Sequence, residues 1–163
     1  MLILGIDPGY ATIGYGMVEC KYAKFAPVRF GAITTPAGME FPARLEMIWQ
    51  DMTILLNRCK PDVLAIEKLF FTSNKTTAID VAQARGVILL AAQQHQVPVR
   101  QYTPLQVKQA VVGYGKAEKH QVMEMTRQIL GLDAVPKPDD TADALALAIC
   151  HGNCEGSMLA HLK

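Results

Sequence analysis

The chain has 163 residues, of which 50% are hydrophobic and 19% are charged, and its formal net charge is +1. This length suits one domain with a substantial core and is too short for two large lobes. No apolar stretch approaches the roughly 20 residues of a membrane span, and the chain begins with a strand-like run rather than a basic leader. We therefore expect a cytoplasmic protein of one domain that does not contact a membrane.

The first part of the chain is typical of an antiparallel meander followed by an amphipathic helix. The predicted strands have short, turn-rich connections, which favour antiparallel pairing, and they cover residues 2–7, 13–20 and 28–35. Apolar residues then recur at helical spacing over 41–59. Pro61 and Asp62 end this helix, and the buried strand from Val63 to Glu67 is expected to lie parallel to the first strand.

The remainder of the chain is mainly helical. We predict a helix over about 76–96, a strand from Val99 to Tyr102, and helices that begin at Pro104, at Lys116 and at about Asp139. The helix over 76–96 carries apolar residues around most of its circumference, so it must be buried on two sides. One side can pack on the sheet, and the other is covered either by neighbouring helices or by a second subunit.

Four acidic residues stand where a domain has little structural use for them. Asp7 and Glu67 each end an apolar strand, whereas Asp140 and Asp143 are three residues apart and share one face of the last helix. Acids at a helix N-terminus are also ordinary caps, but open α/β sheets place their sites at strand ends. Converging buried carboxylates indicate a cation, and hard oxygen ligands without a His or Cys set suit magnesium or manganese.

A basic stretch precedes the last helix. It contains two acidic residues and five basic residues. The basic residues are Arg100, Lys108, Lys116, Lys119 and Arg127. Such a mixed run is either a solvated helix surface or a phosphate-binding face.

These residues lie in motifs that resemble the RuvC family of Holliday-junction resolvases. The matching motifs are Gly5-Ile6-Asp7-Pro8-Gly9, Ala65-Ile66-Glu67 with Phe70, Ala82-Gln83-Ala84-Arg85-Gly86, Tyr102-Thr103-Pro104 through Lys108, Val112 through Lys119, and Asp140-Thr141-Ala142-Asp143-Ala144-Leu145-Ala146. The resemblance covers about residues 1–151, in order and at the family spacing. Residues 152–163 match no motif of the family.

The resemblance implies a ribonuclease H-like α/β fold, with a mixed five-stranded sheet made of a three-strand antiparallel meander plus parallel strands and flanked by helices. One nuclease domain would cover residues 1–151, and residues 152–163 would form a C-terminal tail. It further implies a homodimer that nicks two opposed strands of a four-way DNA junction in homologous recombination and DNA repair. Proteins of the RuvA and RuvB type, which drive branch migration, would be its partners.

The resemblance also implies roles for single residues. Two Mg²⁺ ions, or Mn²⁺ in their place, would be held by Asp7, Glu67, Asp140 and Asp143. Asp7 would bridge the two ions. Glu67 would bind the ion at the leaving group, and Asp140 and Asp143 would bind the ion at the nucleophile. Lys119 would be catalytic, and the DNA contacts would come from Lys108, Lys116, Lys119 and Phe70. Phe70 corresponds to an aromatic residue that stacks on an unpaired base, and Phe71 is its core partner or its substitute.

Two other functions compete with this interpretation. An actin-like ATPase also carries Gly-Ile-Asp in its first strand, but it needs two nucleotide-clasping lobes that 163 residues cannot build. A non-catalytic junction-binding module is expected to lack at least one of the four acids, and all four are present. A junction-cleaving enzyme is therefore the favoured prediction.

Overall fold

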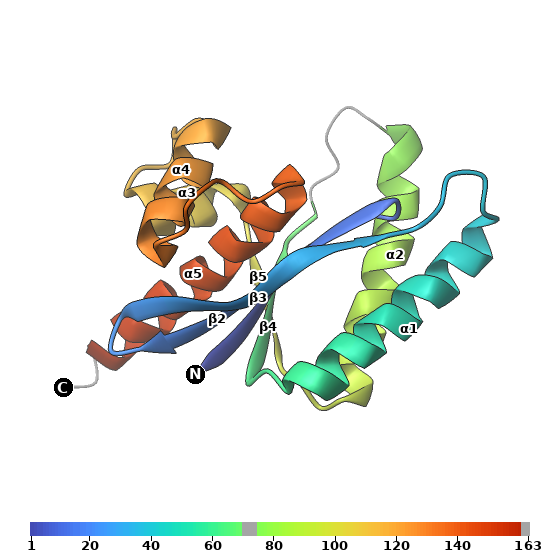
Figure 1. Cartoon of the computed structure of the whole chain (residues 1–163), viewed down its shortest axis with the longest axis horizontal. Helices are drawn as coiled ribbons and strands as arrows, with labels where there is room; N and C mark the ends of the chain where they lie inside the picture. The colour runs from blue at the N-terminus through green and yellow to red at the C-terminus, as the bar shows by residue number, and fades with distance from the viewer. Residues whose placement is uncertain (70–74, 161–163) are drawn as a thin grey trace.

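The computed structural model describes residues 1–69 and 75–160 and contains one mixed sheet between two layers of helices (Figure 1). The strands follow the order β3-β2-β1-β4-β5 and comprise β1 (Leu2–Asp7), β2 (Thr12–Lys21), β3 (Lys24–Thr34), β4 (Val63–Glu67) and β5 (Val99–Tyr102). Strands β1, β2 and β3 pair antiparallel, whereas β4 pairs parallel with both β1 and β5. The predicted meander and the parallel strands are confirmed.

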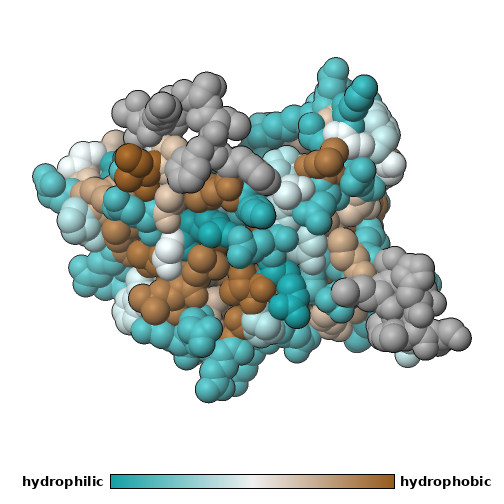
Figure 2. All heavy atoms as spheres, turned by 180° about the vertical axis from the view of Figure 1, so that it is seen from behind, coloured by the Kyte–Doolittle hydropathy of each residue, from teal (hydrophilic) through white to brown (hydrophobic). Residues whose placement is uncertain are grey.

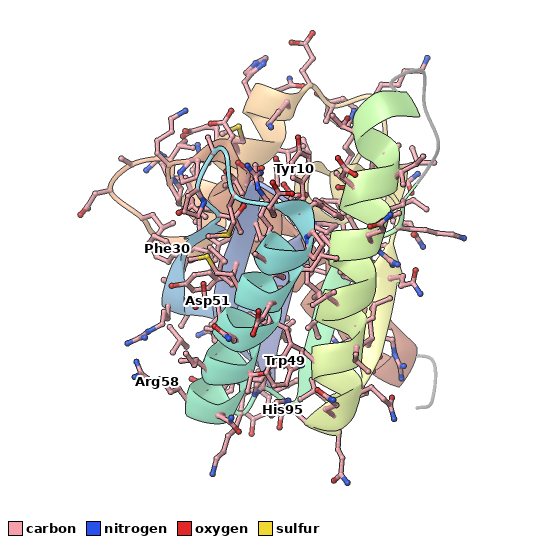
Figure 3. All side chains as sticks on the ribbon, turned by 90° about the vertical axis from the view of Figure 1, so that its right-hand side faces the viewer. Tyr10, Phe30, Trp49, Asp51, Arg58 and His95 are labelled. Atoms are coloured by element: carbon pink, nitrogen blue, oxygen red, sulfur yellow. The ribbon has the colours of Figure 1, made fainter. Side chains whose placement is uncertain are left out.

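The helices divide between the two faces of the sheet. Helices α1 (Phe41–Cys59) and α2 (Lys75–Gln94) cover one face, and the other face carries α3 (Pro104–Val112), α4 (Lys119–Leu130) and α5 (Asp139–Ala160) (Figure 1). Figure 3 shows α1 and α2 side by side, with Trp49 and His95 near one end of their seam and Tyr10 near the other. Within the described part of the chain, no helix is long and apolar enough to span a bilayer.

Several boundaries differ from the prediction for local reasons. Strands β2 and β3 extend further because Tyr22 and Ala23, both at positive φ, close a two-residue hairpin turn. Helix α4 begins at Lys119 rather than at Lys116, because Glu118 is its N-cap and forms a capping box with Gln121. Helix α5 continues to Ala160. The division into a domain of residues 1–151 and a tail stays a prediction.

The sheet buries a separate apolar cluster on each of its faces. Leu4, Ile6 and Ile88 belong to the cluster under α1 and α2, whereas Ile3 and Leu145 belong to the cluster under α3, α4 and α5. Side chains alternate between the faces of a strand, so each strand contributes to both clusters.

Helix α2 is covered on one side only. Its buried residues face the sheet and α1, and they are Ala84, Ile88, Ala91 and Ala92. Ile79 and Leu90 remain 59% and 52% exposed, so α1 does not cover the outward side. On the face shown in Figure 2, apolar patches interrupt the polar surface on the side where α2 lies.

Candidate active site

Strand alternation places Asp7 and Glu67 on the same face of the sheet. In β1, Leu4 and Ile6 face α1 and α2, so Asp7 lies on the opposite face, toward α5. In β4, Ile66 likewise faces α1 and α2, which leaves Glu67 on the α5 face. Because β1 and β4 are adjacent and parallel, the two acids meet at the carboxyl ends of neighbouring strands.

Two glycines let the last helix approach this edge closely. A Cβ atom at Gly14 would overlap the carbonyl oxygen of Asp140, and one at Gly5 would overlap the carbonyl oxygen of Ala144. Gly14 is the residue paired with Asp7 across β1 and β2. The first turn of α5 therefore lies directly against the strand that carries Asp7, and the hydroxyl of Thr141 anchors it by donating to the carbonyl of Gly31 at 3.0 Å.

The four acids repel one another electrostatically. Burial, followed by the charges of Asp143, Glu67 and Asp140, raises the pKa of Asp7 from 3.8 to about 8. Burial and the charge of Asp143 raise the pKa of Glu67, against a hydrogen bond from Asp7 that lowers it. Burial is also the main cause of the raised pKa of Asp143. The predicted acids are thus brought together, and their negative charges are poorly compensated.

Lys119 provides a cation that directly contacts one of these acids. It is the first residue of α4, and its Nζ atom lies 2.9 Å from a carboxylate oxygen of Asp143 and 3.9 Å from one of Asp139. The hydrogen bond to Asp143 raises the pKa of Lys119, so the amine is charged at neutral pH. Lys119 therefore offsets part of the acidic charge.

A pocket of about 200 Å³ opens beside the acids. It is lined by Glu67, Asp143, Lys108 and Lys119, with an apolar wall of Pro104, Val107, Val122 and Leu147. Lys108 belongs to α3 and Lys119 to α4, so two helices deliver cations to one pocket.

Two other residues of the basic stretch, Lys116 and Arg127, do not line this pocket. Lys116 is exposed in the turn before α4 and is not among the lining residues of this pocket. Arg127 is held by Glu124, with 2.7 Å between Nη2 and Oε1, so it does not act as a free cation of the basic stretch. Phe70 and Phe71 lie outside the described residues.

The chemistry of the donor set fits a hard divalent cation. Four carboxylates provide only oxygen ligands, and a cation would offset both the burial and the neighbouring acidic charges that raise the pKa of Asp7. Among residues 1–69 and 75–160, no group of three or more His, Cys, Asp or Glu side chains is already arranged to hold an ion. The fit therefore rests on charge and ligand type, and one oxygen of Asp143 already contacts Lys119.

The family model for the crossover junction endodeoxyribonuclease RuvC matches residues 3–151. The chain belongs to the RuvC family. It is 56% identical over 151 residues to the RuvC of Brevibacillus brevis, with 93% of this chain and 91% of that protein covered. It is 55% identical over 153 residues to the RuvC of Desulfitobacterium hafniense, with 94% and 93% covered. The structure of T. thermophilus RuvC in complex with a Holliday junction substrate superposes with a TM-score of 0.91 at 36% identity, covering 97% of this chain and 96% of that one.

Membership in the RuvC family confirms the resemblance and the ribonuclease H-like α/β fold. Arg85 lies in a matched motif but received no role from the sequence. Arg85 of α2 donates a hydrogen bond to the main-chain carbonyl of Glu67, at 3.1 Å from Nε. Its signal in the sequence is a single cation in the otherwise uncharged run Ala82-Gln83-Ala84-Arg85-Gly86.

Proposed function

We propose that this chain resolves four-way DNA junctions by paired nicks, through hydrolysis of phosphodiester bonds that depends on two divalent metal ions. One observation carries the proposal: four carboxylates from β1, β4 and α5 converge at a partly buried edge of the sheet, where burial and then the charges of the other three acids raise the pKa of Asp7 to about 8. Burying an acid among three others has no structural benefit and matches a site completed by cations. The complex of T. thermophilus RuvC with a Holliday junction supports the junction as the substrate.

Asp7, Glu67, Asp140 and Asp143 would hold the ions, with magnesium as the expected metal. Bound ions would supply Lewis-acid chemistry, which makes water a better nucleophile and offsets charge on the leaving oxygen. Asp7 stands between acids of β4 and α5, so it is the residue best placed to serve both ions. A protonated Asp7 donates a hydrogen bond to Glu67, and this proton must leave before both carboxylates can bind metal.

The cations beside the acids would hold and stabilise the phosphate. Lys119 and Lys108 line the same pocket as Glu67 and Asp143, so a phosphate there would meet two positive side chains. A lysine point charge near the scissile phosphate offsets the negative charge that develops during cleavage. Lys116 and Phe70 would extend the contact with DNA, Lys116 through the backbone phosphates and Phe70 by stacking on an unpaired base.

Paired nicks require two sites, and the outward side of α2 fits the homodimer that would supply them. One stripe of exposed residues on this helix has spacings of four, three and four residues, and it comprises Ile79, Gln83, Gly86 and Leu90. Gly86 in the middle of a helix costs roughly 0.5–1 kcal/mol relative to Ala, yet a Cβ there would meet nothing within 4 Å. A second copy that packs closely on this stripe would account for both the exposed apolar residues and the glycine.

The decisive experiment is cleavage of a synthetic four-way junction, with a linear duplex of the same sequence as the control. We expect two nicks in opposed strands, dependent on Mg²⁺ or Mn²⁺ and absent in EDTA. Binding without cleavage at any metal concentration would favour a junction-binding module, and equal cleavage of the duplex would exclude junction selectivity. Partners of the RuvA and RuvB type and a cytoplasmic location belong to the same proposal, and co-purification with junction-bound branch-migration proteins tests the first of these.

A further inference from the structure

Arg85 of α2 fastens the main chain at the point where β4 delivers Glu67 to the site. Its Nε donates to the carbonyl oxygen of Glu67 at 3.1 Å, and its Nη2 donates to Oε1 of Gln101 on β5 at 2.6 Å. The amide of Lys68 donates to the carbonyl of Tyr102 at 2.8 Å. The carbonyl of Glu67 and the amide of Lys68 belong to one planar peptide group, so this group is held from both sides.

The position of that peptide group determines where the Glu67 carboxylate can reach. Glu67 is the last residue of β4, and its strand partner Tyr102 is the last residue of β5. The bond from the Lys68 amide to the Tyr102 carbonyl is the last one between the two strands at this end, and a displacement of the peptide group would carry the Cα, Cβ and carboxylate of Glu67 with it. Catalytic constellations require placement within roughly 0.5 Å.

Arg85 acts on Glu67 through the main chain rather than through its charge. Burial and the charge of Asp143 raise the pKa of Glu67, Asp7 and Lys119 lower it, and Arg85 is not among the groups that shift it. Burial lowers the pKa of Arg85, and no carboxylate of the described residues forms an ion pair with it. Partly removing a guanidinium from water without an ion pair is costly. The two hydrogen bonds that Arg85 donates offset part of this cost, and they fix the direction of its side chain.

We propose that Arg85 is a positioning residue for Glu67, and that its hydrogen bond to the Glu67 carbonyl sets the affinity of the acidic site for divalent metal. The proposal rests on the function proposed above, because it takes Glu67 as a metal ligand. Outer residues that orient a ligand typically change metal affinity or activity 10–100-fold when they are replaced. Arg85 would act in this way from the helical layer on the far side of the sheet.

The test compares Arg85→Gln with Arg58→Gln, which removes the same charge from an exposed position of α1. Mn²⁺ binding to the protein alone is measured by calorimetry, junction binding in EDTA by mobility shift, and cleavage under single turnover across Mg²⁺ concentrations. We expect Arg85→Gln to weaken Mn²⁺ binding roughly 10-fold or more. Its junction affinity should stay within about twofold of the wild type, since α2 is not part of the basic stretch, and high Mg²⁺ should restore part of the rate.

Arg58→Gln should match the wild type in all three measurements. Arg85→Lys should lie between wild type and Arg85→Gln, because one amine can reach the Glu67 carbonyl without also bridging to Gln101. Unchanged Mn²⁺ affinity in folded Arg85→Gln would overturn the proposal. So would a loss of melting temperature with no change in metal dependence, which is the signature of a purely structural link.

If Arg85→Gln does not fold, Gln101→Leu provides the second variant, because it releases Nη2 and leaves Nε in place. It should weaken Mn²⁺ binding in the same direction by a smaller factor, and an unchanged affinity would count against Arg85. A wild type that binds Mn²⁺ but never cuts junctions would refute the proposed function alone. The calorimetric comparison of the variants would still decide whether Arg85 positions Glu67.

Discussion

Replacing Asp7 by Asn should inactivate the protein and stabilise its metal-free form. Asp7 has a pKa of about 8 in the folded chain and an ordinary value of 3.8. An acid whose pKa is raised on folding favours the folded state fully below its unfolded value, and that contribution is lost as the pH rises toward the folded value. The metal-free wild type should therefore lose stability between about pH 4 and pH 8.

The magnitude follows from the same shift. One pKa unit corresponds to about 1.36 kcal/mol. At pH 7 Asp7 is ionised in the unfolded chain and mostly protonated in the folded chain, and this difference lowers the free energy of unfolding by at most about 4 kcal/mol. An asparagine carries no charge, and its amide can donate the hydrogen bond that protonated Asp7 donates to Glu67. We expect Asp7→Asn to gain on the order of 1–4 kcal/mol in EDTA at pH 8, which corresponds to a rise of several degrees in Tm.

The assay is thermal unfolding from pH 5 to pH 9, in EDTA and in Mg²⁺, with Asp51→Asn on α1 as the matched control. The Tm difference between Asp7→Asn and wild type should grow with pH in EDTA and shrink in Mg²⁺, because the ion stabilises only the intact site. Junction cleavage should be lost while junction binding persists, since the basic residues are untouched. A variant that is less stable than wild type at pH 8, by an amount independent of pH, would refute the electrostatic argument.

Three further predictions concern other parts of the molecule. Leu90→Glu should convert the proposed dimer to folded monomers, as measured by sedimentation. Val28→Glu, at a similarly exposed apolar residue of β3, should leave the dimer intact. A wild type that is itself monomeric at micromolar concentration would contradict the dimer. Lys119→Met should slow single-turnover cleavage roughly 100-fold. Mg²⁺ affinity should stay the same or rise, because Asp143 loses the lysine that competes with the ion for its carboxylate. An unchanged cleavage rate would show that Lys119 has no role in catalysis. Phe70→Ala should slow cleavage of an intact junction more than that of a junction with unpaired bases at its centre, at nearly unchanged Tm; equal slowing with a large drop in Tm would instead make it a core residue.

The convergence of the four acids could be predicted from the sequence because its evidence is local. Apolar runs that end in Asp7 and Glu67 identify buried strands, and alternation then decides which face each acid takes. The spacing of Asp140 and Asp143 is equally local, since helix geometry alone puts them on one face. Motif order supplied the rest, because the chain matches the RuvC family over residues 3–151.

What the sequence did not predict depends on contacts between distant segments. Gly14 gives no local sign that Asp140 will pack against it, although this approach brings α5 to Asp7. Arg85 likewise gives no sign that it reaches a carbonyl 18 residues earlier in the chain. The strand extensions around Tyr22 and Ala23 were missed because non-glycine residues seldom adopt positive φ.

The arrangement of the two faces would let the proposed dimer form without blocking the acidic site. Asp7 and Glu67 project toward α5, whereas the exposed stripe with Ile79 and Leu90 lies in the helical layer on the other side of the sheet. A second copy on that stripe therefore leaves the pocket between Lys108 and Lys119 open to a DNA strand in each subunit. Arg85 connects the two sides, because it belongs to α2 and holds the peptide group that carries Glu67. A shift of α2 on dimerisation would reach the acidic site through this hydrogen bond, so the metal affinity of Leu90→Glu monomers should be lower than that of wild-type dimers.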